Sequence, residues 1–182
     1  VEGPWSHGGW ARMDGSKLGN ASFATNTSKF FQDEIEYPFF LYHLKGKGDG
    51  AKLPEAYVFE TGRNEWHKMD AWPPKQTTAK TFYFQPAGKL DTKAPAEADA
   101  FDEYISDPAK PVPFVPYIDR GMNYNYMTDD QRFAASRPDV LVYQTEPLKG
   151  DLRIAGPLKA TLYVSTTGTD SDFVVKLVDV FP

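Results

Sequence analysis

The sequence predicts a mostly β protein in which a β-sandwich or jelly roll follows one helical segment. Aromatic residues make up 15% of the 182 residues, and there are 15 Pro and 14 Gly, a composition typical of strands and turns rather than of helix bundles. After residue 55, strand-like runs are separated by turn-forming residues, with no helix between successive runs. Strands without intervening helices indicate a sandwich or a jelly roll. The runs cover 56–60, 81–84, 140–143, 158–164 and 173–180.

The residues before these strands have a different pattern. Residues 1–29 are rich in Gly, Ser, Asn and Thr and are predicted to form one irregular loop. Thr27-Ser28 is predicted to cap a helix that starts near Lys29, because apolar residues recur at helical spacing from there on. Pro38 should kink or split this helix, and Lys45-Gly46 should end it.

A polar linker, KGKGDGAK over residues 45–52, is predicted to hold a domain boundary. It divides the chain into residues 1–48 and 49–182. The chain begins inside a motif and ends on an apolar, strand-like run over 173–182, so we interpret it as an internal piece of a longer protein, truncated in its last domain. Since an unpaired apolar strand invites aggregation, this piece should be poorly soluble. Residues 106–131 form a long proline-rich excursion.

Charge and composition exclude several classes of function. The net charge is −5 and the pI about 5.2, so a nucleic-acid backbone is not an expected partner. There is no basic amphipathic pattern, and no apolar run approaches the roughly 20 residues that cross a bilayer, so no membrane partner is expected. The absence of cysteine excludes disulfides, thiolate metal sites and a cysteine nucleophile within these residues.

A histidine in the opening run, GPWSHG over residues 3–8, is the main candidate for chemistry. Taken by itself, one histidine in a glycine-rich loop favours a surface or packed residue. As a functional residue, His7 would be the general base of a serine hydrolase, taking the proton from the serine hydroxyl while an Asp orients the ring. In α/β-hydrolases the histidine follows the Ser and the acidic residue along the chain, so a histidine loop followed by one last helix fits the end of such a domain.

The motif around His7 resembles the histidine motif of the family of cocaine esterases, X-prolyl dipeptidyl peptidases and α-amino-acid ester hydrolases. Further stretches resemble the same family, in the family's order and over nearly the whole chain. They are residues 15–19, 38–45, 61–66 with 71–74, 104–108 with 111–114, 136–148 and 167–179. The similarity is strongest to α-amino-acid ester hydrolases and glutaryl-cephalosporin acylases.

The resemblance implies that residues 1–48 are the last loop and helix of an α/β-hydrolase domain and that a jelly roll begins near residue 49. It implies acyl transfer on small-molecule esters or amides, as in amino-acid ester, β-lactam acyl or X-Pro dipeptide hydrolysis, with His7 as the catalytic histidine. The Ser and Asp would come from the remainder of the same polypeptide, so this chain alone should be inactive. No cofactor or metal is expected. The resemblance also implies a periplasmic or secreted location, without excluding the cytoplasm, and suggests a homo-oligomer.

The tryptophans admit two interpretations. Trp5 and Trp10 flank His7 and are candidates for lining the substrate pocket; alternatively they pack the loop onto its domain. Trp66 and Trp72 could form a sugar-stacking platform in a non-catalytic β-sandwich binding module, whereas the alternative is a hairpin turn at 61–66 and a packed anchor. A purely structural interaction domain is a third possibility.

The remaining polar candidates are interpreted as structural. Arg137 and Asp139 are expected to form an ion pair or a turn, and Asp170-Ser171-Asp172 a tight turn rather than a calcium loop. His43 is expected to be partly buried on the helix, and His67 to have no partner. The three histidines are too scattered to predict a zinc site.

Overall fold

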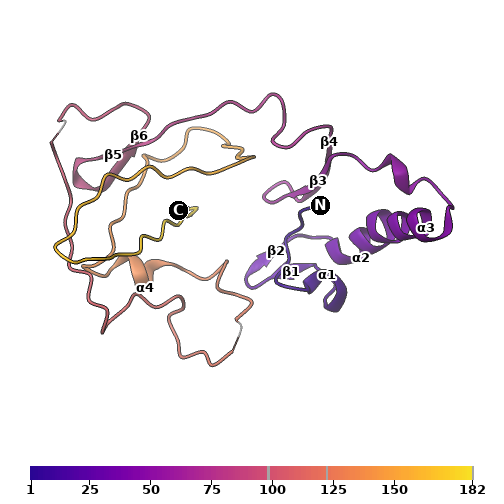
Figure 1. Ribbon diagram of the computed structural model, residues 1–182, viewed down its shortest axis with the longest axis horizontal. Helices are drawn as coiled ribbons and strands as arrows, with labels where there is room; N and C mark the ends of the chain where they lie inside the picture. Colours follow the sequence, from indigo (N-terminus) through magenta and orange to yellow (C-terminus); the bar gives the residue numbers. More distant parts are fainter. Residues whose placement is uncertain (98, 122, 182) are drawn as a thin grey trace.

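The computed structural model describes residues 1–97, 99–121 and 123–181. Met122 of the predicted excursion and Pro182 of the predicted last strand therefore lie outside the described residues. Figure 1 shows most of the helical turns in the N-terminal part and long irregular segments, with one short helix among them, over the rest. The described residues form short strands in three two-stranded antiparallel sheets, with few helices and no closed barrel. Short strands with few helices are thus confirmed, and the sandwich or jelly roll stays a prediction.

The N-terminal part is more ordered than the predicted single loop. It contains helix α1 (Gly9–Arg12), strands β1 (Lys17–Leu18) and β2 (Ala21–Ser22), and helix α2 (Thr27–Phe31). The prediction that Thr27 and Ser28 cap the helix was wrong, because Asn26 occupies the N-cap position. The two hydroxyls instead donate to backbone carbonyls of the preceding loop, from Thr27 to Gly15 at 2.7 Å and from Ser28 to Gly9 at 3.4 Å.

Pro38 alters the helix without separating it into two pieces. A π-helical turn, Gln32–Glu36, joins α2 to α3 (Tyr37–Lys45), and Pro38 lies in the first turn of α3. Proline lacks an N–H, and a π-turn is one way in which a helix accommodates a missing bond. The predicted end at Lys45 is confirmed, with the Gly46 N–H donating to the Tyr42 carbonyl at 2.8 Å. In the described residues, no helix combines the length and the apolar character that a bilayer crossing requires.

The β3–β4 hairpin follows the linker. Strand β3 (Ala56–Glu60), which was predicted, pairs with β4 (Glu65–Met69), which was not, and Phe59 lies opposite Trp66. The predicted turn over 61–64 joins them. A smaller hairpin pairs β5 (Tyr83–Gln85) with β6 (Lys89–Asp91) through the predicted turn at 86–88.

Three predicted strands were wrong. Residues 140–143, 158–164 and 173–180 have no ladder of hydrogen bonds to a neighbouring strand in the described part of the chain. Nearby, Gln144 makes an isolated bridge to Lys89. These segments carry β-favouring side chains, but a strand also needs a partner at hydrogen-bond distance. The excursion at 106–131 is irregular in its described residues, as predicted, and is followed by helix α4 (Arg132–Ala135).

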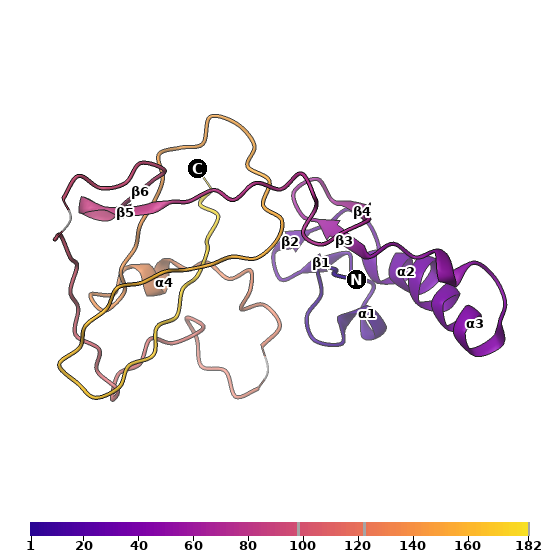
Figure 2. The ribbon, with the colours of Figure 1, turned by 45° about the horizontal axis from the view of Figure 1, so that its top comes forward.

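The buried cluster joins the two parts of the chain. Leu18 and Phe23, from the β1–β2 region, pack against Phe59 of β3, with Ala21 and Trp66 partly buried around them. Both views place β1 and β2 beside the β3–β4 hairpin (Figures 1 and 2). The predicted division near residue 48 therefore does not coincide with a gap in packing, and as a domain boundary it stays a prediction.

Candidate active-site loop around His7

The loop that carries His7 is fixed by its own backbone and by Arg12. The Ser6 carbonyl accepts from the Gly9 N–H at 2.9 Å, and the Arg12 guanidinium donates to the His7 carbonyl at 2.6 Å. Gly8 has φ +70°, a conformation that favours glycine, and a Cβ there would collide with the Arg12 guanidinium. Helix α1 begins at the next residue. The sequence around His7 thus builds a tight turn that presents an exposed imidazole.

His7 lines a cavity of about 170 Å³ together with a residue from far along the chain. The other lining residues are Ser6, Gly9, Arg12, Met13 and Tyr124. Tyr124 belongs to the excursion at 106–131 and is 45% exposed. Sequence reasoning did not identify it, because no local pattern around residue 124 indicates proximity to residue 7.

The loop that carries Tyr124 is internally hydrogen-bonded. The Asn125 N–H donates to the Asn123 side chain at 2.6 Å, and the Thr128 N–H donates to the Asn125 carbonyl at 2.8 Å. Thr128 lies against Gly19, in the β1–β2 turn, so closely that a Cβ at Gly19 would collide with its hydroxyl. The C-terminal part of the chain therefore reaches the His7 cavity through a defined loop.

His7 has no acidic partner in the described residues. The histidine–carboxylate ion pairs found there are those of His67. Nearby, Asp14 accepts from both the backbone N–H and the hydroxyl of Ser16 at 2.9 Å, and these bonds hold the pKa of Asp14 below its ordinary value. Ser6 is buried, and its hydroxyl contacts the Met13 sulfur at 3.9 Å. The described residues thus present a histidine without an orienting carboxylate.

Trp5 and Trp10 do not line the His7 cavity. The Trp5 ring packs 5.2 Å from Phe31 and 5.8 Å from Trp66, and its indole N–H donates to the Thr27 hydroxyl at 2.8 Å. Trp10 lies 6.3 Å from Trp5 at the surface of α1. The packing interpretation accounts for Trp5; a role for either side chain in a larger pocket stays a prediction.

The proposed sugar platform does not match the arrangement of its two tryptophans. Trp66 stacks on Phe30 at 5.2 Å with 15° between the planes, so one face is covered. Trp72 is 42% exposed and lies in the irregular segment after β4. Trp66 is therefore a packing residue of the hairpin.

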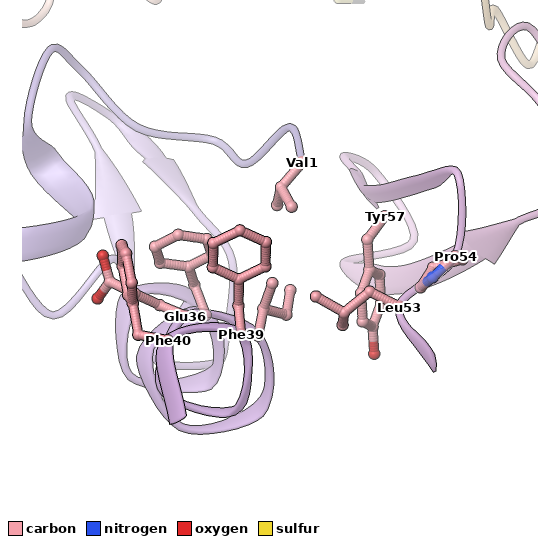
Figure 3. A pocket seen from close by; sticks show the side chains of 9 residues that line it. Val1, Glu36, Phe39, Phe40, Leu53, Pro54 and Tyr57 are labelled. Carbon is pink, nitrogen blue, oxygen red and sulfur yellow. The ribbon is translucent and has the colours of Figure 1, made fainter. Parts of the chain in front are cut away.

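A second, larger cavity lies between α3 and the start of β3. It has a volume of about 440 Å³ and is lined by Val1, Phe31, Ile35, Glu36, Phe39, Phe40, Leu53, Pro54 and Tyr57. In Figure 3, Val1, Phe39 and Leu53 face a common space, with Tyr57 on its far side. Burial, with a smaller contribution from the charge of Glu34, raises the pKa of Tyr57. Glu36 is the charged side chain of this otherwise largely apolar lining.

Other polar predictions have mixed outcomes. The Arg137–Asp139 ion pair is confirmed, with contacts of 2.8 and 2.6 Å, and it lowers the pKa of Asp139. His43 was predicted to be partly buried but is exposed, with its ring against Phe39. His67 was predicted to have no partner, but its Nε2 lies 2.8 Å from Glu60, because β-pairing brings the end of β3 beside β4.

Comparison with known proteins places the chain in a family. Residues 48–182 match the X-Pro dipeptidyl-peptidase C-terminal non-catalytic domain, and the chain belongs to that family, which confirms the resemblance inferred from the motifs. The whole chain is 34% identical over 197 residues to 33% of a cocaine esterase from Rhodococcus sp. (strain MB1 Bresler). It is 29% identical over 188 residues to 28% of a putative serine esterase from Mycobacterium bovis. The chain thus spans about a third of the length of these relatives.

Two solved structures are similar to this chain and agree with the family found by sequence. An aminopeptidase from the marine sediment archaeon Thaumarchaeota archaeon superposes with a TM-score of 0.75 at 42% identity, over 85% of this chain and 26% of that one. An α-amino acid ester hydrolase superposes with a TM-score of 0.75 at 41% identity, with the same coverage.

Proposed function

We propose that this chain provides the catalytic histidine and the C-terminal domain of a serine hydrolase that acts on esters or amides of small acyl groups. The observation that carries the proposal is the geometry of His7. Its imidazole is exposed at a small cavity, on a turn fixed by Gly8 and Arg12. A residue held in this way, with a free ring, suits proton transfer to and from a group supplied by another segment.

In this proposal His7 Nε2 takes the proton of a serine hydroxyl as the oxygen attacks the substrate carbonyl. It then gives that proton to the leaving alcohol or amine, and an acyl-enzyme forms. Water then attacks the acyl-enzyme with His7 again as base; the bond between the acyl carbon and the serine oxygen breaks, His7 returns the proton to that oxygen, and the free acid leaves. A carboxylate accepting from Nδ1 would hold the ring in the correct tautomer. The serine and the carboxylate would come from the remainder of the polypeptide.

The C-terminal part, proposed to be a jelly roll over 49–182, would contribute to the substrate pocket through Tyr124. This phenol belongs to the lining of the same cavity as His7. Its position suits contact with an acyl or leaving group, where an aromatic ring supplies a large rigid surface.

The exposed face of α3 supports a larger surrounding domain. Its apolar side chains at the surface are Tyr37, Phe39, Phe40, Tyr42 and Leu44. An apolar helix face of this kind is ordinarily covered by a neighbouring element. We propose that the remainder of the hydrolase domain covers it.

The test is the variant His7→Ala in the intact protein, assayed with p-nitrophenyl esters. We expect kcat to fall on the order of 10³-fold or more, with the unfolding transition unchanged, because the imidazole is exposed. His67→Gln is the matched control, since it alters a histidine in an ion pair outside the cavity. Full activity in His7→Ala contradicts the proposal. The chain of residues 1–182 alone should show only background hydrolysis.

A further inference from the structure

The β3–β4 hairpin belongs to the part of the chain matched by the non-catalytic domain, yet it contacts the His7 loop at two places. The first contact is made by the backbone. The Glu2 N–H donates to the Tyr57 carbonyl at 3.0 Å, and the Phe59 N–H donates to the Glu2 carbonyl at 2.9 Å. Glu2, five residues before His7, therefore lies beside β3 in an isolated parallel bridge with Val58.

The second contact is made by Trp66 of β4. Its ring lies 5.8 Å from Trp5, two residues before His7. It also stacks on Phe30 of α2 and meets the edges of two β3 rings, Tyr57 at 5.6 Å and Phe59 at 5.4 Å. One side chain thus touches the His7 loop, α2 and β3 together.

Trp66 does not line the His7 cavity. Trp66 meets the loop at Trp5, whose indole N–H also donates to the Thr27 hydroxyl. If the Trp66 ring is removed, Trp5 keeps its hydrogen bond and its contacts with Phe31 and Trp10 but loses the aromatic neighbour that the hairpin contributes. A shift of Trp5 is passed to His7 through a single intervening residue, Ser6.

We propose that Trp66 is a positioning residue for His7, and that the hairpin holds the catalytic loop in register by the Trp66–Trp5 contact and the Glu2 bridge. The inference rests on the proposed function of His7. Proton transfer needs heavy atoms about 2.6–3.2 Å apart, so a small displacement of the loop lowers the rate even though the imidazole itself is unchanged.

The experiment uses the intact enzyme and compares Trp66→Leu, Trp66→Phe and the control Trp72→Leu. Active sites are counted by fluorophosphonate labelling carried to completion, so that any unfolded fraction is removed from kcat. We expect Trp66→Leu to lower kcat per active site about 10- to 100-fold, with KM changed less than about 2-fold. Trp66→Phe keeps an aromatic wall and should restore most of the rate, and Trp72→Leu should match the wild type.

A second pair keeps the test decisive if Trp66→Leu does not fold. Glu2→Pro removes the N–H that donates to Tyr57, whereas Glu2→Ala changes only an exposed side chain. Glu2→Pro should lower kcat per active site, and Glu2→Ala should not. Normal kcat per active site in both Trp66→Leu and Glu2→Pro, or a change confined to KM, overturns the positioning role. If His7→Ala is itself fully active, the proposed function fails instead, so the two failures are distinguishable.

Discussion

The hydroxyl of Thr27 offers the sharpest test of how the His7 loop is held. This fully buried residue donates to the Gly15 carbonyl at 2.7 Å and accepts from the Trp5 indole at 2.8 Å. Thr27→Val keeps the shape but leaves both partners without their bond. Each unsatisfied buried group costs about 1–3 kcal/mol, so we expect the two together to cost about 2–6 kcal/mol. Thr27→Ser keeps the hydroxyl and should lose about 1 kcal/mol, for one methyl group.

Urea unfolding of the intact protein measures this difference, and tryptophan fluorescence is a suitable signal because Trp5 is itself a partner of Thr27. The Val variant should unfold at a clearly lower urea concentration than the Ser variant, with similar slopes. Equal midpoints for the two would refute the reasoning, since removing the bridging hydroxyl would then cost no more than removing one methyl group.

The other predictions concern one glycine and two hydrogen-bonded pairs, in each of which one partner is an aspartate. Gly15→Ala should destabilise by at least about 2 kcal/mol in urea unfolding, because φ is +73° and the new Cβ would lie 2.5 Å from the Ser28 nitrogen. Asp139→Asn should destabilise at neutral pH. The lowered pKa of Asp139, caused by its bonds to Arg137, means that this stabilisation is present above about pH 3.9 and is lost as pH falls through the folded-state value, where the two proteins should converge. Burial and the bond to Asp102 raise the pKa of Tyr143 to about 12. Asp102→Asn should lower that value in an absorbance titration at 295 nm, and the associated stabilisation should be lost as pH rises from about 10 towards 12.

Local signals predicted the fold better than long-range ones. The helix end at Gly46 and the turn at 61–64 follow from neighbouring residues, and both are confirmed. Residues 158–164 were predicted as a strand from their β-favouring side chains, but pairing is a property of two segments, and one segment's sequence does not reveal its partner. Strand β4 shows the converse, since the sequence EWHKM forms a strand through its register with β3.

The candidate site shows the same difference between local and long-range sequence signals. His7 was found because the residues around it form a contiguous motif, and its exposed position at a cavity agrees with that interpretation. Tyr124 was missed because its place beside His7 depends on the packing of its loop against Gly19. The partner of His67 was missed for a related reason, because Glu60 meets it only after the hairpin closes.

The buried residues also bear on what a non-catalytic domain contributes. Leu18 and Phe23 lie before the family match begins, and Phe59 and Trp66 lie within it, yet they form one cluster. A cluster shared in this way transmits the position of one segment to the other, because close-packed side chains cannot move independently. Under the proposed function, residues that never touch a substrate would set a reaction rate by fixing the backbone that carries His7. The term non-catalytic would then describe only which atoms react, and the Trp66 and Glu2 variants test whether the hairpin helps to place them.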